Sequence, residues 1–291
     1  MIYTEVFSES KTRLFADDTS LILFHKNQKE LKTIAVNQIE RLVRWCNSNK
    51  LTINFEKTYY ILFRSKNKSI KPDLNEININ GKAIKRVSSI KYLGVYIDEL
   101  LTWREHVLFI HKSLVKYYGI FNHVKRFLNK KIIRKIYFAF VYSRIQYGIE
   151  IWGGCGKDLL HRIQVIQSGL LKMLLTKNRM YSTNQLHLEM RLLKVKDIYR
   201  MQLLLFMTKC LHGKSTQIFN SFFSVALRPY HLRNQGYETD YARTNVGYFS
   251  IKNNCIREWN NIPHQLKDKS MQLNFKKHIA THYLTYYRTN D

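Results

Sequence analysis

The apolar residues of this 291-residue chain follow two different periodicities, and the change from one to the other falls near residue 98. Before it, short apolar runs rich in β-forming residues are separated by turn signals. After it, apolar residues recur every three or four positions, as on one face of a helix. Only three prolines and eleven glycines occur, which favours many helices and few loops. The sequence therefore predicts an α+β fold in which a small mixed unit precedes a mostly helical remainder.

Turn and cap signals divide the first part of the chain. The stretch "RLFADDTSLILF", Arg13 to Phe24, holds an Asp-Asp pair between two β-rich runs and predicts a hairpin. Asn27 with Glu30 has the capping-box pattern and opens a long helix that ends at 47–50. We then expect a strand over 52–63, a hairpin around Asn80-Gly81 and one further strand over 90–98.

Similar signals mark helices in the second part. Thr102 with Glu105 repeats the capping-box pattern, and Asn129 caps another apolar-periodic run that Gly148 ends. Further helices are predicted over 157–175, 183–190 and 194–212, the last ended by Gly213. After about residue 215 the pattern predicts no defined element.

A net charge of +27, from 48 Lys and Arg against 21 Asp and Glu, calls for a polyanionic partner. Nucleic acid is the first candidate, an anionic membrane the second, and a solvated lysine-rich surface the plain alternative. The 44 residues between Glu105 and Glu150 contain no acid, which favours contacts with phosphates. The cations expected to make these contacts are Lys112, Lys116, Lys125, Arg126, Lys130, Lys131, Arg134 and Lys135, with Arg144 in the same stretch. Residues 57–72 also lack acids, and a solvated basic loop is expected there.

Cysteine spacing and hydropathy exclude several other classes of protein. The four cysteines lie far apart, so neither a local zinc site nor a disulfide framework is expected, and buried reduced thiols are. The longest apolar runs are about six residues, too short to cross a membrane. No signal peptide is recognised, so we expect a nuclear or cytoplasmic protein.

The Asp17-Asp18 pair has two readings. Aspartate is a common turn residue, so the pair could be a solvated turn. Adjacent carboxylates at a rigid hairpin tip could instead share a hard cation such as Mg²⁺, which prefers oxygen ligands and usually takes one or two carboxylates plus substrate phosphates. The neighbouring sequence decides between these readings.

Several stretches resemble, in order, the reverse transcriptases of non-LTR retrotransposons of the LINE or jockey-like type. These are "FADD" at Phe15 to Asp18, Lys57-Thr58 before a strand, "NGKAIKRVSSIKYLGVYID" at Asn80 to Asp98, "LLTWREHV" at Leu100 to Val107, and "WNNIP" with "FKKHI" at Trp259 to Pro263 and Phe275 to Ile279. The resemblance implies a partial palm over 1–98, made of a βαβ unit plus a hairpin with an antiparallel sheet. It also implies a helical thumb over 99–155 and a mostly helical C-terminal region over 156–291. It implies an RNA or RNA–DNA duplex as the partner.

The resemblance also implies roles for individual residues. Asp17 and Asp18 would be catalytic and would hold the divalent metals, Mg²⁺ or Mn²⁺. Lys57 would neutralise or protonate the leaving pyrophosphate, although a plain surface lysine fits equally well. Residues near the primer would be Phe15, Tyr92, Leu93 and Gly94; Gly94 could equally be an ordinary strand glycine or bulge.

One departure from the family pattern bears on activity. The family needs a further metal-binding Asp on an earlier strand, a Gly-rich loop and fingers, whereas only sixteen residues precede Asp17 and their acids are Glu5 and Glu9. We therefore expect an N-terminally truncated polymerase fragment, inactive alone. The alternatives are a non-catalytic basic module that binds RNA or RNA–DNA duplex, and a decayed product without a role.

Overall fold

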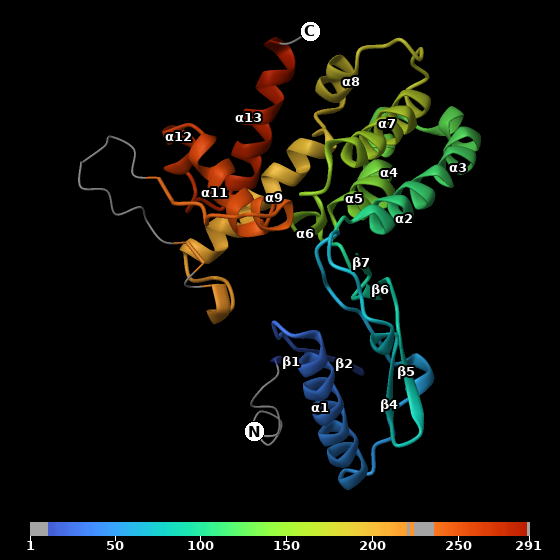
Figure 1. Cartoon of the computed structure of the whole chain (residues 1–291). Coiled ribbons are helices and arrows are strands. Elements are labelled where there is room, and N and C mark those ends of the chain that lie inside the picture. The colour runs from blue at the N-terminus through green and yellow to red at the C-terminus, as the bar shows by residue number, and fades with distance from the viewer. Residues whose placement is uncertain (1–10, 220–221, 224–235, 290–291) are drawn as a thin grey trace. The chain divides into compact units, whose positions relative to one another are not determined.

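The computed structural model describes residues 11–219, 222–223 and 236–289, and the chain divides into two compact units, Met1–Leu101 and Thr102–Asp291 (Figure 1). Among the described residues, all strands lie in the first unit and every α-helix but one lies in the second. This is the predicted α+β class, and the boundary between the units falls close to the residue where the periodicity changes. Glu5 and Glu9 lie outside the described residues.

The first unit begins with the predicted hairpin. Strands β1, Lys11–Phe15, and β2, Asp18–Ile22, pair antiparallel with Phe15 opposite Asp18, so the loop consists of Ala16 and Asp17. These two strands form a sheet of their own among the described residues. Ala16 has a φ of 51°, a left-handed conformation at the first loop position where glycine is usual in such turns.

A three-stranded sheet follows, with the order β3-β5-β4. Strands β4, Glu76–Ile79, and β5, Lys82–Arg86, form the predicted antiparallel hairpin, and both Asn80 and Gly81 have positive φ. Strand β3 is only Tyr59–Tyr60 and pairs parallel with β5, so the sheet is mixed rather than purely antiparallel.

Two strand predictions in this unit are wrong. Most of 52–63 belongs to no strand, and within it the Asn54 side chain accepts a hydrogen bond from the Lys57 amide and caps a 3₁₀ turn, Phe55–Lys57. The single strand expected over 90–98 is a second hairpin, β6 at Ser89–Tyr92 and β7 at Val95–Asp98. Its turn is made by Leu93 and Gly94, with φ of 45° and 83°.

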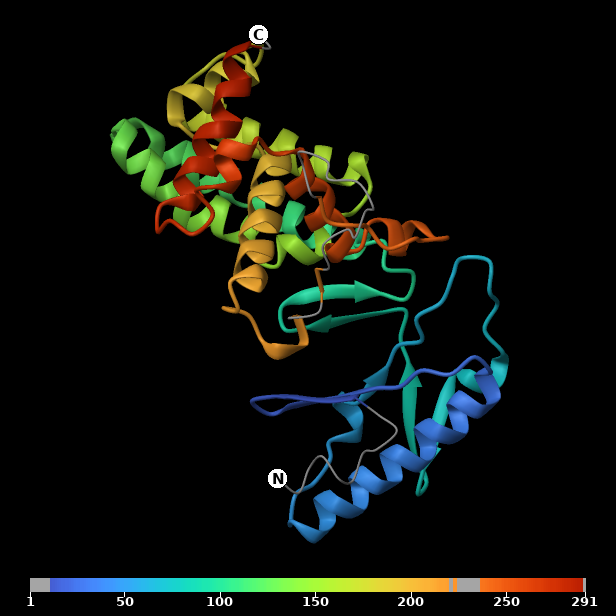
Figure 2. The ribbon, with the colours of Figure 1, turned by 90° about the vertical axis from the view of Figure 1, so that its left-hand side faces the viewer.

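Helix α1, Gln28–Ser48, runs along the β4–β5 hairpin and closes a small core (Figure 2). The buried members of that core are Ala35, Ile77, Ile79 and Ile84. Asn27 caps α1 as predicted, since its side-chain oxygen accepts from the Lys29 amide.

The predicted capping box at Asn27 and Glu30 is only half formed. The Asn27 amide donates to Nδ1 of His25 at 3.1 Å, and Glu30 instead pairs with Nε2 of His25 at 3.1 Å. The His25 ring therefore accepts from the Asn27 amide in place of the Glu30 side chain, and it contacts that side chain itself.

The second unit is built from helices whose positions match the predictions up to residue 213. Asn129 caps α4 and Gly213, with a φ of 65°, follows α9, as expected. The helices are α2 (Arg104–Val115), α3 (Tyr117–Val124), α4 (Lys130–Ile136), α5 (Ser143–Gln146), α6 (Ile149–Trp152), α7 (Lys157–Leu174), α8 (Thr183–Met190), α9 (Val195–Leu211), α10 (Asn245–Tyr248), α11 (Ile251–Asn261), α12 (His264–Lys267) and α13 (Phe275–Thr289).

Two local features differ from the prediction. The N-cap of α2 is Trp103, with a φ of 64°, and Thr102 accepts from the Arg104 amide, so the helix begins one residue later than the predicted capping box places it. Between α4 and α5, residues Tyr137–Tyr142 form a wider π-helical turn within the expected continuous helix.

One apolar core runs through the second unit. Its buried residues extend from Val107 on α2 to Tyr283 on α13, so the segments 99–155 and 156–291 share it. Three of the four cysteines, Cys46, Cys210 and Cys255, are buried, and all four are free, as predicted. In the described part of the chain, no helix has the length and apolar character needed to cross a membrane.

Candidate active site and nucleic-acid interface

The Asp-Asp pair lies at the tip of the first hairpin. Asp17 is the second loop residue and Asp18 opens β2 opposite Phe15, which places Asp18 and Phe15 as a cross-strand pair. Both aspartates are exposed, and Phe15 keeps 60% of its surface exposed. The hairpin is therefore not part of a buried sheet, although apolar runs flank it. It presents two carboxylates and an aromatic ring to solvent.

The donor set at this tip suits a hard cation. Carboxylate oxygens are the ligands that Mg²⁺ and Mn²⁺ prefer, and two of them suffice when substrate phosphates complete the coordination. Within residues 11–219, 222–223 and 236–289, no group of three or more His, Cys, Asp or Glu side chains comes together. Asp17 and Asp18 thus fit one metal ion held jointly with a substrate rather than a closed protein site.

Lys57 is the last residue of a 3₁₀ turn and is exposed two positions before β3. Its amide is fixed by the Asn54 side chain at 3.2 Å, whereas its ammonium group has no described ion pair. The motif prediction of a lysine directly before a strand therefore matches the local structure, and the plain reading as a surface lysine stays open.

The candidate primer-binding residues occupy one turn. Tyr92 ends β6, and Leu93 and Gly94 form the loop that leads into β7. Gly94 has a φ of 83°, so the turn itself requires a residue without a Cβ. Leu93 adopts the same left-handed region without that freedom, and such strain concentrates at functional sites.

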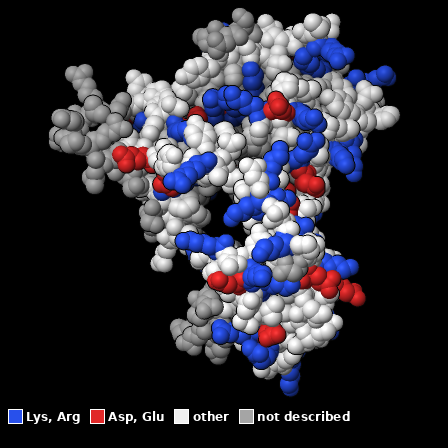
Figure 3. All heavy atoms as spheres, in the orientation of Figure 1, with Lys and Arg blue, Asp and Glu red and all other residues white. Residues whose placement is uncertain are grey.

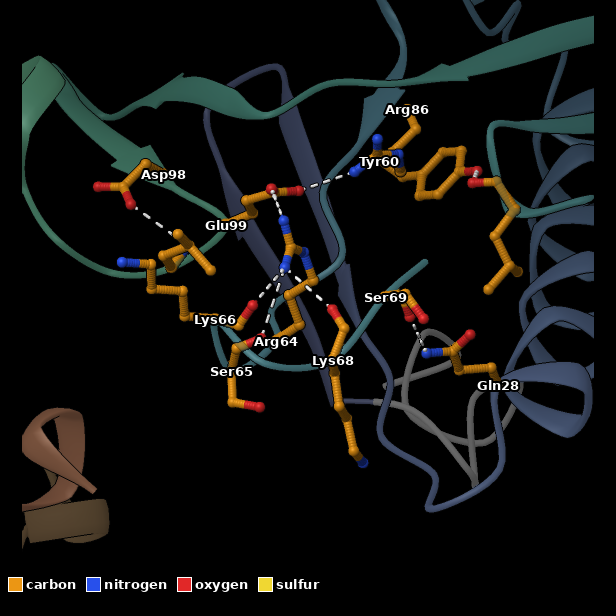
Figure 4. A network of polar contacts seen from close by, with 12 residues as sticks. Gln28, Tyr60, Arg64, Ser65, Lys66, Lys68, Ser69, Arg86, Asp98 and Glu99 are labelled. Atoms are coloured by element: carbon orange, nitrogen blue, oxygen red, sulfur yellow. Dashed lines mark hydrogen bonds and ion pairs between the residues drawn. The ribbon is translucent and has the colours of Figure 1, made fainter. Parts of the chain in front are cut away.

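A polar network stabilises the first unit at the open end of the β6–β7 hairpin, opposite this turn (Figure 4). The Glu99 carboxylate, whose side chain is only 13% exposed, accepts from Arg64 and from Arg86, each at 2.7 Å. The Arg64 guanidinium also donates to the carbonyl of Lys68 at 3.0 Å, so it holds the basic loop that follows it. Charge-assisted bonds of this kind are strong, and these residues were not singled out by the sequence because their partners are distant along the chain.

The helical cations divide into two groups in the structure. Arg134 donates to the carbonyls of Met190 and Arg191 at the end of α8, and its guanidinium lies 4.9 Å from the Phe138 ring. Lys130 pairs with Glu189 at 3.1 Å. The remaining candidates have no described ion pair or side-chain hydrogen bond: Lys112, Lys116, Lys125, Arg126, Lys131 and Lys135.

Four aromatic residues of this stretch belong to the core or pack against it: Tyr117, Tyr118, Phe121 and Tyr137. Phe121 and Tyr137 are buried, and the Tyr137 hydroxyl accepts from Gln167 at 2.6 Å. Burial raises the pKa of Tyr137 above its usual range. Arg144 donates to the Tyr117 hydroxyl at 2.8 Å and so joins α5 to α3.

In the second unit, Figure 3 shows Lys and Arg side chains spread over the helices with few acids among them.

Comparison with known proteins gives consistent relatives. The chain is 27% identical over 164 residues, 54% of its length, to a probable RNA-directed DNA polymerase from transposon BS of Drosophila melanogaster. It is 24% identical over 197 residues, 66% of its length, to a probable RNA-directed DNA polymerase from transposon X-element of the same species. The polymerase of the mobile element jockey, also from that species, is 22% identical over 161 residues, 54% of the chain.

The chain is similar, at low identity, to several RNA-directed DNA polymerases of non-LTR retrotransposons. This confirms the resemblance inferred from the motifs. The matched parts make up 18%, 21% and 17% of these three relatives, so the chain spans about a fifth of their length. No protein-family model and no solved structure matches the chain.

Proposed function

We propose that this chain is a palm and thumb portion of an RNA-directed DNA polymerase. The observation that carries the proposal is the exposed hairpin tip, where a two-residue loop presents Asp17 and Asp18 in the order that the family motif requires. Residues 1–98 would supply part of the palm, 99–155 the thumb, and 156–291 a helical C-terminal region. The relatives named as RNA-directed DNA polymerases support this reading.

In this function, Asp17 and Asp18 would hold Mg²⁺ or Mn²⁺ together with the phosphates of a substrate. The metal would neutralise charge on the phosphate under attack and on the leaving pyrophosphate. Lys57 would add a further positive charge toward the leaving group. Phe15, next to the loop, and the Tyr92–Gly94 turn would position the primer end.

The cations of α2 to α4 would hold an RNA–DNA duplex by its phosphates. Contacts of this type fix the position of a duplex but carry no sequence information. Arg134 and Lys130 would contribute less than the motif suggests, because each already has a partner on α8 or next to it.

Primer extension tests the catalytic part of the proposal. The 291-residue chain, assayed alone on an oligo(dT)-primed poly(rA) template with Mg²⁺ or Mn²⁺, should incorporate no nucleotide, because Asp17 and Asp18 are joined by no third acid among the described residues. An in-frame upstream extension carrying an acidic strand and a Gly-rich loop, if mapping the transcript's 5′ end reveals one, should restore incorporation.

The Asp17→Asn variant is the control for both assays. It should abolish the incorporation restored by the extension. If the chain alone incorporates nucleotides and Asp17→Asn removes that activity, the expectation of inactivity is wrong while the metal assignment stands. If the extended chain polymerises equally well with and without the Asp17→Asn substitution, the metal assignment is wrong.

A further inference from the structure

The second unit contains a cleft of about 1030 Å³ that the polymerase motifs do not involve. Side chains of α7, α9, α11 and α13 line it, and none of the eight cations assigned to duplex binding is among them. Its volume is at the upper end of the roughly 300–1,000 Å³ usual for small-molecule pockets. In Figure 3, Lys and Arg side chains gather over the region where α9 and α13 approach each other.

The cleft is lined by five Lys and Arg residues against three acids, and two of these acids share contacts with one arginine. Asp197 accepts a hydrogen bond from the Tyr287 hydroxyl and pairs with Arg200 at 3.4 Å. Glu258 accepts from the Tyr283 hydroxyl at 2.6 Å and pairs with the same arginine at 3.5 Å. Burial and these carboxylates raise the pKa values of both tyrosines, which therefore stay protonated and donate.

Other cations of the lining stay available for a ligand. Lys157 and Lys196 are exposed and have no described ion pair. Among the acids of the lining, the exposed Asp158 likewise has no described ion pair. The Arg257 guanidinium lies 3.9 Å from the Tyr248 ring and donates to Asn254 at 2.7 Å, which holds it in place beside the cleft. Fixed and flexible cations are thus combined along one groove.

Two aromatic side chains of the lining, which come from separate elements, are half exposed. Phe249, which follows α10, keeps 49% of its surface exposed, and Tyr286 on α13 keeps 51%. Leaving such rings in water costs apolar burial. Exposed aromatic rings beside a basic groove are the means by which proteins bind unpaired bases, which stack on the rings while the backbone phosphates meet Lys and Arg.

We infer that this cleft binds single-stranded nucleic acid. A duplex would not use the aromatic rings, because its bases are already stacked, and a single mononucleotide would leave much of the volume of about 1030 Å³ unused. The site goes beyond the proposed polymerase function and does not depend on the metal hairpin. It would let the C-terminal helices hold an unpaired strand while α2 to α4 hold a duplex.

Fluorescence anisotropy with the full chain tests the stacking part. A short labelled oligouridylate, the matching oligothymidylate and a duplex of equal length serve as probes. Tyr286→Ala and Phe249→Ala should each weaken single-strand binding about tenfold, as expected for the loss of one stacked base, and leave duplex binding unchanged. Tyr286→Trp should keep the affinity, and Tyr241→Ala, which removes an 88% exposed ring outside the cleft, should have no effect.

A charge pair tests the phosphate part. Lys157→Ala with Lys196→Ala should weaken single-strand binding more than Lys276→Ala with Lys277→Ala, which removes equal charge from exposed sites on α13 outside the cleft. Circular dichroism checks that each variant is folded. If Tyr286→Ala or Phe249→Ala does not fold, the Lys157→Ala with Lys196→Ala variant and the Tyr286→Trp variant still test the inference. Tighter binding of oligouridylate than of oligothymidylate would assign the site to RNA. Equal affinity for the two would mean that the site accepts single-stranded RNA and single-stranded DNA alike.

Two results would overturn the inference. One is equal single-strand affinity in the Tyr286→Ala, Phe249→Ala and Tyr241→Ala variants together with equal effects of the two lysine pairs. The other is a parallel loss of single-strand and duplex binding in the cleft variants. Failure of the duplex surface would appear separately, as a loss of duplex binding only when cations of α2 to α4 are replaced.

Discussion

His187 illustrates how a single residue links the core of the second unit to pH. The ring is fully buried, with Nδ1 3.1 Å from the Leu192 carbonyl and Nε2 3.3 Å from the amide nitrogen of Gln164. The Gln164 oxygen accepts from the Val195 amide at 2.8 Å, so its nitrogen must face the ring and donate to it. A second proton on the ring would meet that donor.

Burial is the main cause that lowers the pKa of His187 from 6.5 to about 4. Because the folded value is below the unfolded one, this histidine stabilises the fold fully above pH 6.5, and the contribution is lost as the pH falls from 6.5 toward 4. The free energy of unfolding should therefore fall by about 2 kcal/mol more between pH 7 and pH 5 in the wild type than in His187→Gln. Urea unfolding at the two pH values measures this difference.

A matched control uses an exposed histidine. His161→Gln should leave the pH dependence as in the wild type. His106 is also buried, and burial lowers its pKa to about 4. The stability of the His187→Gln variant should therefore still depend on pH, but less than that of the wild type. If wild type and His187→Gln lose equal stability on acidification, His187 does not contribute as described.

At the scale of elements, the hairpin that carries Asp17 and Asp18 has few packing contacts. Leu14, Ile22 and Phe24 keep 54%, 51% and 75% of their surfaces exposed, and β1 and β2 pair only with each other in the described sheets. Isolated two-stranded hairpins are marginal in water. Amides over residues 21–24 should therefore exchange with deuterium much faster than those of α7 and α9, whose cores are buried. If the hairpin amides exchange as slowly as those of α7 and α9, the hairpin is packed against other elements, and this prediction is wrong.

The basic helices give a second prediction at this scale. If the six unpaired cations of α2 to α4 and their connection meet phosphates, the slope of log K against log salt for duplex binding should be near −5, at about 0.9 per phosphate. Replacing Lys112, Lys116, Lys131 and Lys135 with alanine should reduce the slope to about −2, as measured by anisotropy titrations at several salt concentrations.

Four other lysines of the second unit provide the control. Alanine at Lys209, Lys214, Lys276 and Lys277 removes the same charge from exposed positions outside α2 to α4. The slope should then stay near −5, about the value for the unmodified chain. Binding that is insensitive to salt, or equal slopes for the two quadruple variants, would refute a duplex surface on these helices.

For the whole molecule, local signals predicted what is decided locally. Asn129 and Asn80-Gly81 lie where cap and turn chemistry place them, because each needs only its neighbours. Leu93 in a left-handed turn was not predictable, since leucine rarely adopts that conformation and tertiary context imposes it. The periodicity did not define the helices after residue 215, which only the resemblance implied as a mostly helical region, although Ser250 caps α11 and Trp259 is buried on it.

The candidate site divides in the same way. The motif order led to Asp17, Asp18 and the family, whereas the contacts that redirect Arg134 and those that join Glu99 to two arginines depend on residues far along the chain. The aromatic cleft joins residues from 153 to 287 and had no local signal. Composition predicted the basic character of the chain but not which cations are already paired.

The central claim is that the first hairpin is a metal-binding part of a polymerase active site. Paramagnetic broadening by Mn²⁺ in the ¹H–¹⁵N spectrum of the full chain with a primer–template tests it most directly. The amides around residues 15–20 should broaden first, and Asp17→Asn with Asp18→Asn should abolish this effect while leaving the rest of the spectrum unchanged. Broadening that begins elsewhere, or that persists in the double variant, would contradict the claim.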